Sequence, residues 1–236
     1  MREQAKGEID DEQVIAWLEP FVSPERRKRI ADVLSRRLAS VAVVLENVYD
    51  PHNGAACLRS TEAFGLQAVH VVPGPSGFPV APKVTQGADR WLDVARHASI
   101  EACYAALHAE GFRVAAALPG AALELEALPV DAPVALVFGN EHEGLSAAAQ
   151  AGADLAFQIP HLGFVQSLNL SVACAVSVHT TAARRRAHLG APGDLGQAHR
   201  RSLQARWYRQ SVEAASEILA RRLAESARPA GTGDTP

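Results

Sequence analysis

Apolar residues gather along the chain into short runs rich in Val, Ala and Leu, and these runs alternate with longer segments of helical periodicity. Nearly continuous apolar runs of this length are typical of strands buried on both faces. The predicted strands are residues 41–48, 68–72, 112–118, 134–139 and 155–160. The predicted helices between and after them are residues 53–64, 98–111 and 169–188. This alternation predicts an α/β fold with a mostly parallel sheet and helices on both of its faces.

The two flanks follow a different pattern, which is helical and rich in arginine. Residues 10–20 and 24–38 predict two short helices, and residues 198–224 predict a final basic helix after a Gly/Pro linker. We therefore expect three parts: a helical extension at 1–38, a central domain at 39–189, and a second helical extension at 190–236. The last eight residues are rich in Asp, Thr, Gly and Pro and are expected to fray.

Composition places the chain among cytoplasmic globular proteins. The segment MREQAKGEIDDEQ has no apolar core of a signal peptide, and no apolar run approaches the length of a membrane span. The three cysteines, Cys57, Cys103 and Cys174, are far apart and lie in apolar, helix-like surroundings. Neither they nor the nine histidines show metal-ligand spacing, so we expect buried thiols in a reducing cytosol and no metal.

Charge is distributed unevenly along the chain. The net charge is −3, but residues 38–183 hold 5 basic and 13 acidic residues, whereas residues 184–236 hold 10 basic and 5 acidic ones. A second basic cluster lies within residues 26–37. Basic clusters of this kind favour binding to nucleic-acid phosphates, although a solvated arginine-rich helix face has the same composition.

Common nucleotide and hydrolase motifs are absent from the sequence, including GxGxxG, GxxxxGK[ST], GxSxG, HExxH and CxxC. Three other segments follow predicted strands, at the edge where open α/β sheets bind ligands. They are NVYDPHNGAACLRSTEAFG (47–65), FGNEHEGLS (138–146) and IPHLGFVQSLNLS (159–171).

Each segment allows a functional and a purely structural interpretation. Arg59 lies on an otherwise apolar helix, so it either binds an anionic ligand or extends outward to water. Glu141 and Glu143 either cap the following helix or hold polar groups of a ligand. The third segment contains no Asp, Glu, Lys or Arg. It is either a buried loop wrapped around a ligand or a strand–turn–helix junction capped by Ser167 or Asn169.

In order and spacing, these segments resemble the three motifs of the SpoU (TrmH) family of 2′-O-ribose methyltransferases, within the SPOUT superfamily. The resemblance covers roughly residues 41–188. The matching positions are Asn53 and Arg59 in the first motif, Gly139, Glu141 and Gly144 in the second, and Pro160, Gly163, Ser167 and Asn169 in the third. The PHN turn and GFVQSLNLSVA are most similar to the tRNA-type members, which methylate guanosine-18 and carry short helical extensions at each end.

The resemblance implies a knotted SPOUT fold with a C-terminal trefoil knot, a homodimer, and an active site shared across its interface. In this family the knot loops bind S-adenosylmethionine in a bent shape. By position those loops are residues 115–119, 138–144 and 159–168, with Ala116, Gly139, Ile159 and Leu168 as the candidate contacts. Methyl transfer from a sulfonium needs no metal.

The implied reaction is methylation of a ribose 2′-hydroxyl in tRNA, with guanosine-18 of the D-loop as the leading target. Arg59 is the candidate catalytic residue, either as a general base or as a clamp for phosphate and alkoxide, and Asn53 supports it from the same or the partner subunit. Ser167 and Asn169 position the loop and the ribose, and Glu141 fixes the loop between strand and helix.

RNA binding is expected of the basic flanks. The candidate phosphate contacts are Arg26, Arg27, Arg29, Arg184, Arg185, Arg186, Arg201 and Arg206. Trp207 and Tyr208 either stack on bases or pack the last helix. Two alternatives stay open: methylation of another tRNA position or of ribosomal RNA, and a non-catalytic RNA-binding protein.

Overall fold

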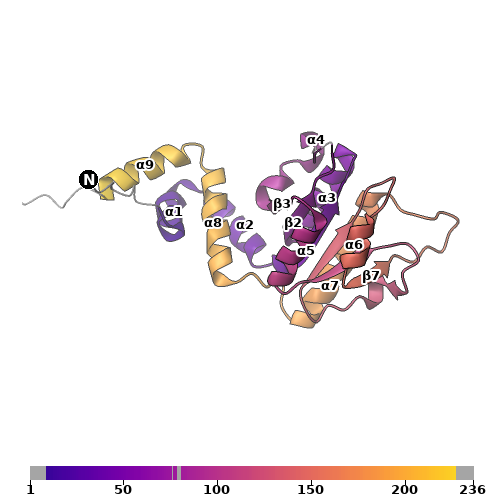
Figure 1. The fold of residues 1–236 in the computed structure, drawn as a ribbon. Helices are drawn as coiled ribbons and strands as arrows, with labels where there is room; N and C mark the ends of the chain where they lie inside the picture. Colours follow the sequence, from indigo (N-terminus) through magenta and orange to yellow (C-terminus); the bar gives the residue numbers. More distant parts are fainter. Residues whose placement is uncertain (1–8, 76, 79–80, 227–236) are drawn as a thin grey trace, which may run out of the picture. The chain divides into compact units, whose positions relative to one another are not determined.

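The computed structural model describes residues 9–75, 77–78 and 81–226 and forms two compact units (Figure 1). The described residues between 36 and 194 make an α/β unit, and residues 9–35 join residues 195–226 in a helical unit. The two extensions, predicted as separate parts, belong to one unit, and the expected fraying of the last eight residues falls outside the described part.

The α/β unit is built on a single sheet, in which seven strands of the described residues pair in the order β3-β2-β1-β6-β4-β7-β5. Every pairing between these strands is parallel, as the alternating pattern predicts. The strands are β1 Leu38–Glu46, β2 Leu66–Val72, β3 Asp93–Arg96, β4 Arg113–Ala117, β5 Leu123–Glu124, β6 Val134–Phe138 and β7 Leu155–Gln158.

Helices cover both faces of this sheet. On one face α3 (Pro51–Ala63) and α7 (Leu170–Leu189) bury Leu58, Cys174 and Val178 against β1 and β6. On the other face α5 (Ile100–Ala109) and α6 (Ala147–Gly152) complete a second apolar cluster. Shorter turns of helix are α4 Pro82–Thr85, η2 Ala88–Trp91 and η3 Leu125–Ala127. The predicted α/β class with two covered faces is thus confirmed.

Helix α3 begins earlier than predicted. Its N-cap is Asp50, whose side chain accepts a hydrogen bond from the His52 amide, and Pro51 takes the first helical position. Asn53 therefore lies inside the first turn and does not cap the helix. Its side chain is free for contacts with other segments. The helix ends as predicted, because Gly65 adopts φ +79°, a left-handed conformation that glycine tolerates.

The helical unit packs α1 (Asp11–Leu18), η1 (Glu19–Phe21), α2 (Pro24–Leu34), α8 (Gln197–Ser211) and α9 (Ala215–Ser226) around a small apolar core. The predicted helix at 198–224 is two helices, because Val212 adopts an extended backbone at the end of α8. Trp207 and Tyr208 are buried, which confirms packing of the last segment over base stacking. Among the described residues, no helix of either unit is both long and apolar enough to span a membrane.

Candidate active site at the carboxyl ends of the strands

The carboxyl ends of β4, β6 and β7 and the start of α7 surround a cavity of about 880 Å³. Because these strands are parallel, their carboxyl ends lie at the same edge of the sheet, where all three predicted motif segments begin. The lining includes Asn53, Ala117, Leu118, Gly139, Glu141, Ile159, Ser167, Leu168 and Asn169. Seven of these nine, all but Ala117 and Leu118, are residues that the motif segments identified, so the motifs converge on one site.

Glu141 joins the loop after β6 to the start of α3. One carboxylate oxygen accepts a hydrogen bond from the Tyr49 amide at 3.1 Å. The other accepts hydrogen bonds from the Asp50 amide at 3.3 Å and from Asn53 Nδ2 at 2.8 Å. Burial raises the pKa of Glu141, but these hydrogen bonds outweigh it and leave the pKa below its ordinary value. The carboxylate is therefore charged at neutral pH and holds the two segments together.

Asn169 extends this connection to the third motif. Its Nδ2 donates a hydrogen bond to Asn53 Oδ1 at 3.1 Å, and its own Oδ1 caps α7 by accepting from the Ser171 amide at 2.8 Å. Asn169 thus serves as the predicted cap and also contacts another motif. One hydrogen-bonded chain therefore runs through Asn53, Glu141 and Asn169 and joins three segments. Glu141 does not cap the following helix, whose N-cap is Ser146.

The loop after β6 folds on itself through Asn140, which sequence reasoning missed. Its backbone exchanges two hydrogen bonds with Gly144, its Oδ1 accepts from the amides of His142 and Glu143, and its Nδ2 donates to Asn47 O at 2.8 Å. Gly139 approaches Gly144 so closely that an added Cβ would lie 2.4 Å from the Gly144 backbone. Asn47, whose carbonyl accepts from Asn140, has φ +50°, a conformation in which Asn is enriched.

Three of the four predicted cofactor contacts, Gly139, Ile159 and Leu168, line the cavity. Ala116 does not: it is fully buried within β4, between Val137 of β6 and Ala156 of β7, and the next residues, Ala117 and Leu118, reach the cavity instead. The loop predicted at 115–119 therefore overlaps the end of β4. The sequence is continuously apolar there and does not mark where the strand ends.

Arg59 lies away from the cavity of its own chain. It follows Asn53 by six positions on α3, about 240° of helical rotation, so the two side chains leave the helix in different directions. Asn53 is buried, whereas Arg59 is exposed and is not among the residues that line the cavity. Within one chain the structure brings together Asn53, Glu141, Ser167 and Asn169, but not Arg59.

The loop after β7 departs from its expected burial. Leu162 and Phe164 are fully exposed, and Val165 is 64% exposed. Tyr49 before α3, and Val172 and Val176 on α7, are further exposed apolar side chains of this unit. Apolar side chains grouped on one unit in this way mark a surface for another macromolecule or ligand rather than for water.

The predicted phosphate contacts in the helical unit differ in their exposure and in their hydrogen bonds and ion pairs with other side chains. Arg26 donates to Ser211 Oγ at 3.3 Å, Arg27 pairs with Glu19 at 3.3 Å, and Arg201 pairs with Glu12. Arg206 is half-buried on α8. Arg29 is exposed on α2. The exposed face of α2 is therefore the most accessible part of this basic set.

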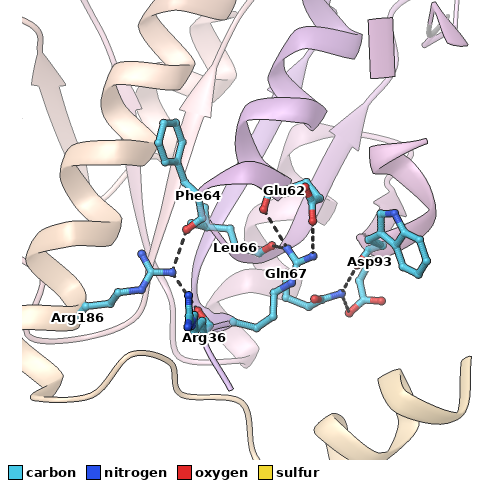
Figure 2. Close-up of polar contacts among 9 residues, drawn as sticks. Arg36, Glu62, Phe64, Leu66, Gln67, Asp93 and Arg186 are labelled. Atoms are coloured by element: carbon cyan, nitrogen blue, oxygen red, sulfur yellow. Dashed lines mark hydrogen bonds and ion pairs between the residues drawn. The ribbon is translucent and has the colours of Figure 1, made fainter. Parts of the chain in front are cut away.

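The run Arg184–Arg186 is engaged by its own unit. Arg184 donates to the carbonyls of Leu125 and Leu128, and Arg185 is buried and donates to Ser40 Oγ at 2.8 Å and Val130 O at 2.7 Å. Figure 2 shows Arg186 Nη2 donating to the carbonyls of Arg36 at 3.0 Å and Phe64 at 2.9 Å. These three guanidiniums hold backbone segments together, a role that the charge count did not reveal.

Comparison with known proteins places this site in a family. The model of the SpoU rRNA Methylase family matches residues 40–179. The tRNA (guanosine(18)-2'-O)-methyltransferase of Borreliella burgdorferi is 32% identical over 208 residues, which cover 87% of this chain and 95% of that protein.

Solved structures agree with this match. The A. aeolicus TrmH/SpoU tRNA modifying enzyme has the same fold, with a TM-score of 0.67 at 23% identity, covering 90% of this chain and 99% of that one. An AdoMet-bound rRNA methyltransferase from Sinorhizobium meliloti is also similar, with a TM-score of 0.56 at 25% identity, covering 68% of this chain and 60% of that one.

Proposed function

Because this chain belongs to the SpoU rRNA Methylase family, we propose that it transfers the methyl group of S-adenosylmethionine to a ribose 2′-oxygen of tRNA, at guanosine-18. The observation that carries the proposal is the hydrogen-bonded chain Asn53–Glu141–Asn169 at the mouth of the cavity. This chain joins all three motif segments. If these residues served only to stabilise the fold, a polar connection at the mouth of a cavity would not be needed.

The cavity fits the cofactor by its size and lining. A volume of about 880 Å³ is that of a small-molecule site, and its walls combine apolar side chains with loop backbone at Leu118, Gly139 and Ile159. These loops would hold the adenosine and the methionine chain. When bound there, the cofactor supplies an electrophilic methyl on a sulfonium. Convergence of the loops after β4, β6 and β7 on one cavity also supports the deep trefoil knot of the family.

The protein's own residues must align the hydroxyl, assist loss of its proton and exclude water. Ser167 and Asn169 line the cavity beside Asn53, where they can position the ribose. A guanidinium is a poor base, because it stays protonated in proteins. We therefore assign Arg59 the role of clamping the phosphate beside the target ribose and stabilising the forming alkoxide.

A homodimer places Arg59 where this role requires it. Arg59 is exposed on α3 and does not line the cavity of its own chain. The apolar side chains Val172 and Val176 are exposed on α7, which packs beside α3. We assign this surface, with Tyr49 and the loop at 162–165, to a symmetric interface with a second copy. In that arrangement Arg59 of one subunit completes the cavity of the other.

Transfer RNA is favoured over ribosomal RNA by the extent of the similarity. The relative named for guanosine-18 aligns over 87% of this chain, more than the family model covers, so the match extends into the helical unit. The exposed basic face of α2 then supplies phosphate contacts.

The test is transfer of labelled methyl from S-adenosylmethionine to unmodified tRNA, followed by mapping of the modified nucleotide. We expect 2′-O-methylguanosine in the D-loop. Modification of another tRNA position or of ribosomal RNA would overturn the assigned substrate and keep the chemistry. Cofactor binding without transfer to any RNA would overturn the enzymatic assignment itself.

Arg59→Ala should abolish transfer while leaving cofactor affinity nearly unchanged, because the role assigned to Arg59 is toward the phosphate and the ribose oxygen of the RNA and not toward the cofactor. Arg113→Ala is the matched control, since Arg113 lies at the opposite end of the sheet and pairs with exposed Asp131. Mixing Arg59→Ala with Asn169→Ala subunits sharpens the test. If Arg59 acts across the interface, a mixed dimer contains one intact site and regains activity. Near-normal turnover of Arg59→Ala would contradict its role, and no recovery on mixing would contradict action across the interface.

A further inference from the structure

Three side chains with metal-binding chemistry gather outside the candidate active site. His70, His97 and Cys103 each offer a ligand atom, and the three atoms all lie within 4.8 Å of one another. His70 and Cys103 are buried, and His97 is half-buried. None of the three lines the active-site cavity. The cluster therefore needs an explanation apart from methyl transfer.

The fold brings these residues together from three separate elements. His70 lies on β2 and pairs with Ala95 of β3, and His97 follows Ala95 by two positions, so both imidazoles leave the same face of the sheet. Cys103 lies on the buried side of α5, which covers this face. The two histidines are 27 residues apart. For this reason no ligand spacing was visible in the sequence. The expectation of no metal rested on that spacing and on the chemistry of methyl transfer, and neither addresses a site away from the cavity.

We propose that His70, His97 and Cys103 form a binding site for a transition-metal ion of the zinc class. Imidazole nitrogen and thiolate sulfur are the ligands that Zn²⁺ prefers, at about 2.0–2.1 Å for nitrogen and 2.3 Å for sulfur. Tetrahedral geometry at those lengths separates the ligand atoms by roughly 3.3–3.6 Å. Here His70 Nδ1 and His97 Nε2 lie 2.9 Å apart, and all three ligand atoms lie within 4.8 Å. Small side-chain shifts therefore bring the cluster to coordination distance.

The surroundings of the cluster favour a cation. Glu46 lies on the same face of the sheet, two residues beyond Val44, which pairs with His70. Its carboxylate is buried near Cys103, where burial first and this charge second raise the pKa of the Cys103 thiol to about 12, so Cys103 keeps its proton until a cation binds. Since His97 is half-buried, water can take the fourth coordination position. Binding displaces the proton shared by the two imidazoles and releases the thiol proton of Cys103.

The competing explanation is a histidine pair that only hydrogen-bonds. The two rings stack with centroids 5.2 Å apart and an interplanar angle of 19°, and one hydrogen bond between them satisfies both nitrogens without a metal. That explanation makes Cys103 a buried residue of the apolar cluster under α5, whereas the metal site requires its sulfur as a ligand. The experiment must therefore detect whether the Cys103 sulfur binds the metal.

The test is titration of untagged, chelator-treated protein with Co²⁺, which reports thiolate ligation by a sulfur-to-cobalt charge-transfer band. We expect saturation at one equivalent, tetrahedral visible bands, and displacement by Zn²⁺. Cys103→Ser should lose the charge-transfer band, and His97→Gln should lose stoichiometric binding. The matched controls are Cys174→Ser, which removes a buried thiol on α7, and His188→Gln, which removes an exposed imidazole on the same helix. Both controls should keep the charge-transfer band and stoichiometric binding.

Two results would overturn the site: absence of the charge-transfer band in the unaltered protein, or its persistence in Cys103→Ser. Should Cys103→Ser fail to fold, His97→Gln carries the test, because that side chain is only half-buried. Zinc should also raise the midpoint of thermal unfolding of the unaltered protein, but not that of His97→Gln. Failure here leaves the methyltransferase proposal intact, because the metal assay does not involve RNA or S-adenosylmethionine.

Discussion

The arginines of α2 and those at the end of α7 look alike in the sequence, yet the structure uses them in opposite ways. Arg184, Arg185 and Arg186 donate to backbone carbonyls or to Ser40 within their unit, and Arg185 is only 7% exposed. On α2, Arg26 and Arg29 are exposed and the buried positions are Ile30 and Leu34. A basic run therefore predicts an RNA-binding surface only if its helix leaves that face open.

The difference follows from helix geometry. Consecutive residues of a helix are rotated by about 100°, so three in a row span more than half of the circumference. Helix α7 packs against α3 and the sheet, and three consecutive arginines on it cannot all face water. A guanidinium carries five donors and can bind several carbonyls at once, as Arg184 does with those of Leu125 and Leu128.

The largest effect, on the free energy of unfolding, should come from replacing the buried Arg185 of α7. Arg185→Met keeps the apolar stem but removes the hydrogen bonds to Ser40 and Val130, in a buried region that also holds Asp194. We expect a loss of about 2–4 kcal/mol in the free energy of unfolding, measured by urea denaturation. Intrinsic tRNA affinity of the remaining folded protein should be unchanged. A stable variant with weakened tRNA binding would instead make Arg185 an RNA contact.

A smaller effect, on tRNA binding alone, should come from replacing an exposed arginine of α2. Arg29→Glu on α2 removes an exposed charge and should weaken tRNA binding by about tenfold, with the salt slope of log K reduced by about one. The measurement is filter binding over a range of salt concentrations. Arg113→Glu, in the α/β unit, is the matched charge reversal and should leave the slope unchanged. An unchanged slope for Arg29→Glu would remove this face of α2 from the RNA surface.

The smallest effect on stability is expected at Arg27, whose ion pair with Glu19 is only partly buried. Arg27→Ala should change the free energy of unfolding by about 1 kcal/mol or less, because exposed ion pairs contribute little. Urea denaturation beside Arg185→Met measures this difference directly. Equal losses for the two variants would mean that burial does not separate the two groups of arginines.

Much of the α/β unit could be predicted because its signals are local. The strands β1, β4 and β6 are continuous apolar runs, and the motif positions Asn53, Glu141 and Asn169 follow strand ends. The edge strand β3 was missed, since Asp93–Arg96 is short, polar and largely exposed. Nothing local marks this strand, which within the described part of the chain pairs with β2 alone.

Other features depend on contacts between distant segments. The burial of Arg185 requires the carbonyl of Val130, 55 positions earlier in the chain. The cluster of His70, His97 and Cys103 requires the pairing of β2 with β3. The exposure of Arg59 away from its own cavity was also invisible to motif matching, because a motif states which residues occur and not which way they point.

The hydrogen-bonded chain through Asn53 also bears on the kinetics of folding. Its two links join residues 88 and 116 positions apart, so each closes a long loop of chain. Long-range contacts of this kind carry the entropy of loop closure before they gain any stabilisation, and folding slows accordingly. The catalytic centre should therefore form among the last events of folding, after the local helices and the pairing of β1 with β2. A chain newly released from the ribosome would have its secondary structure before it had a competent active site.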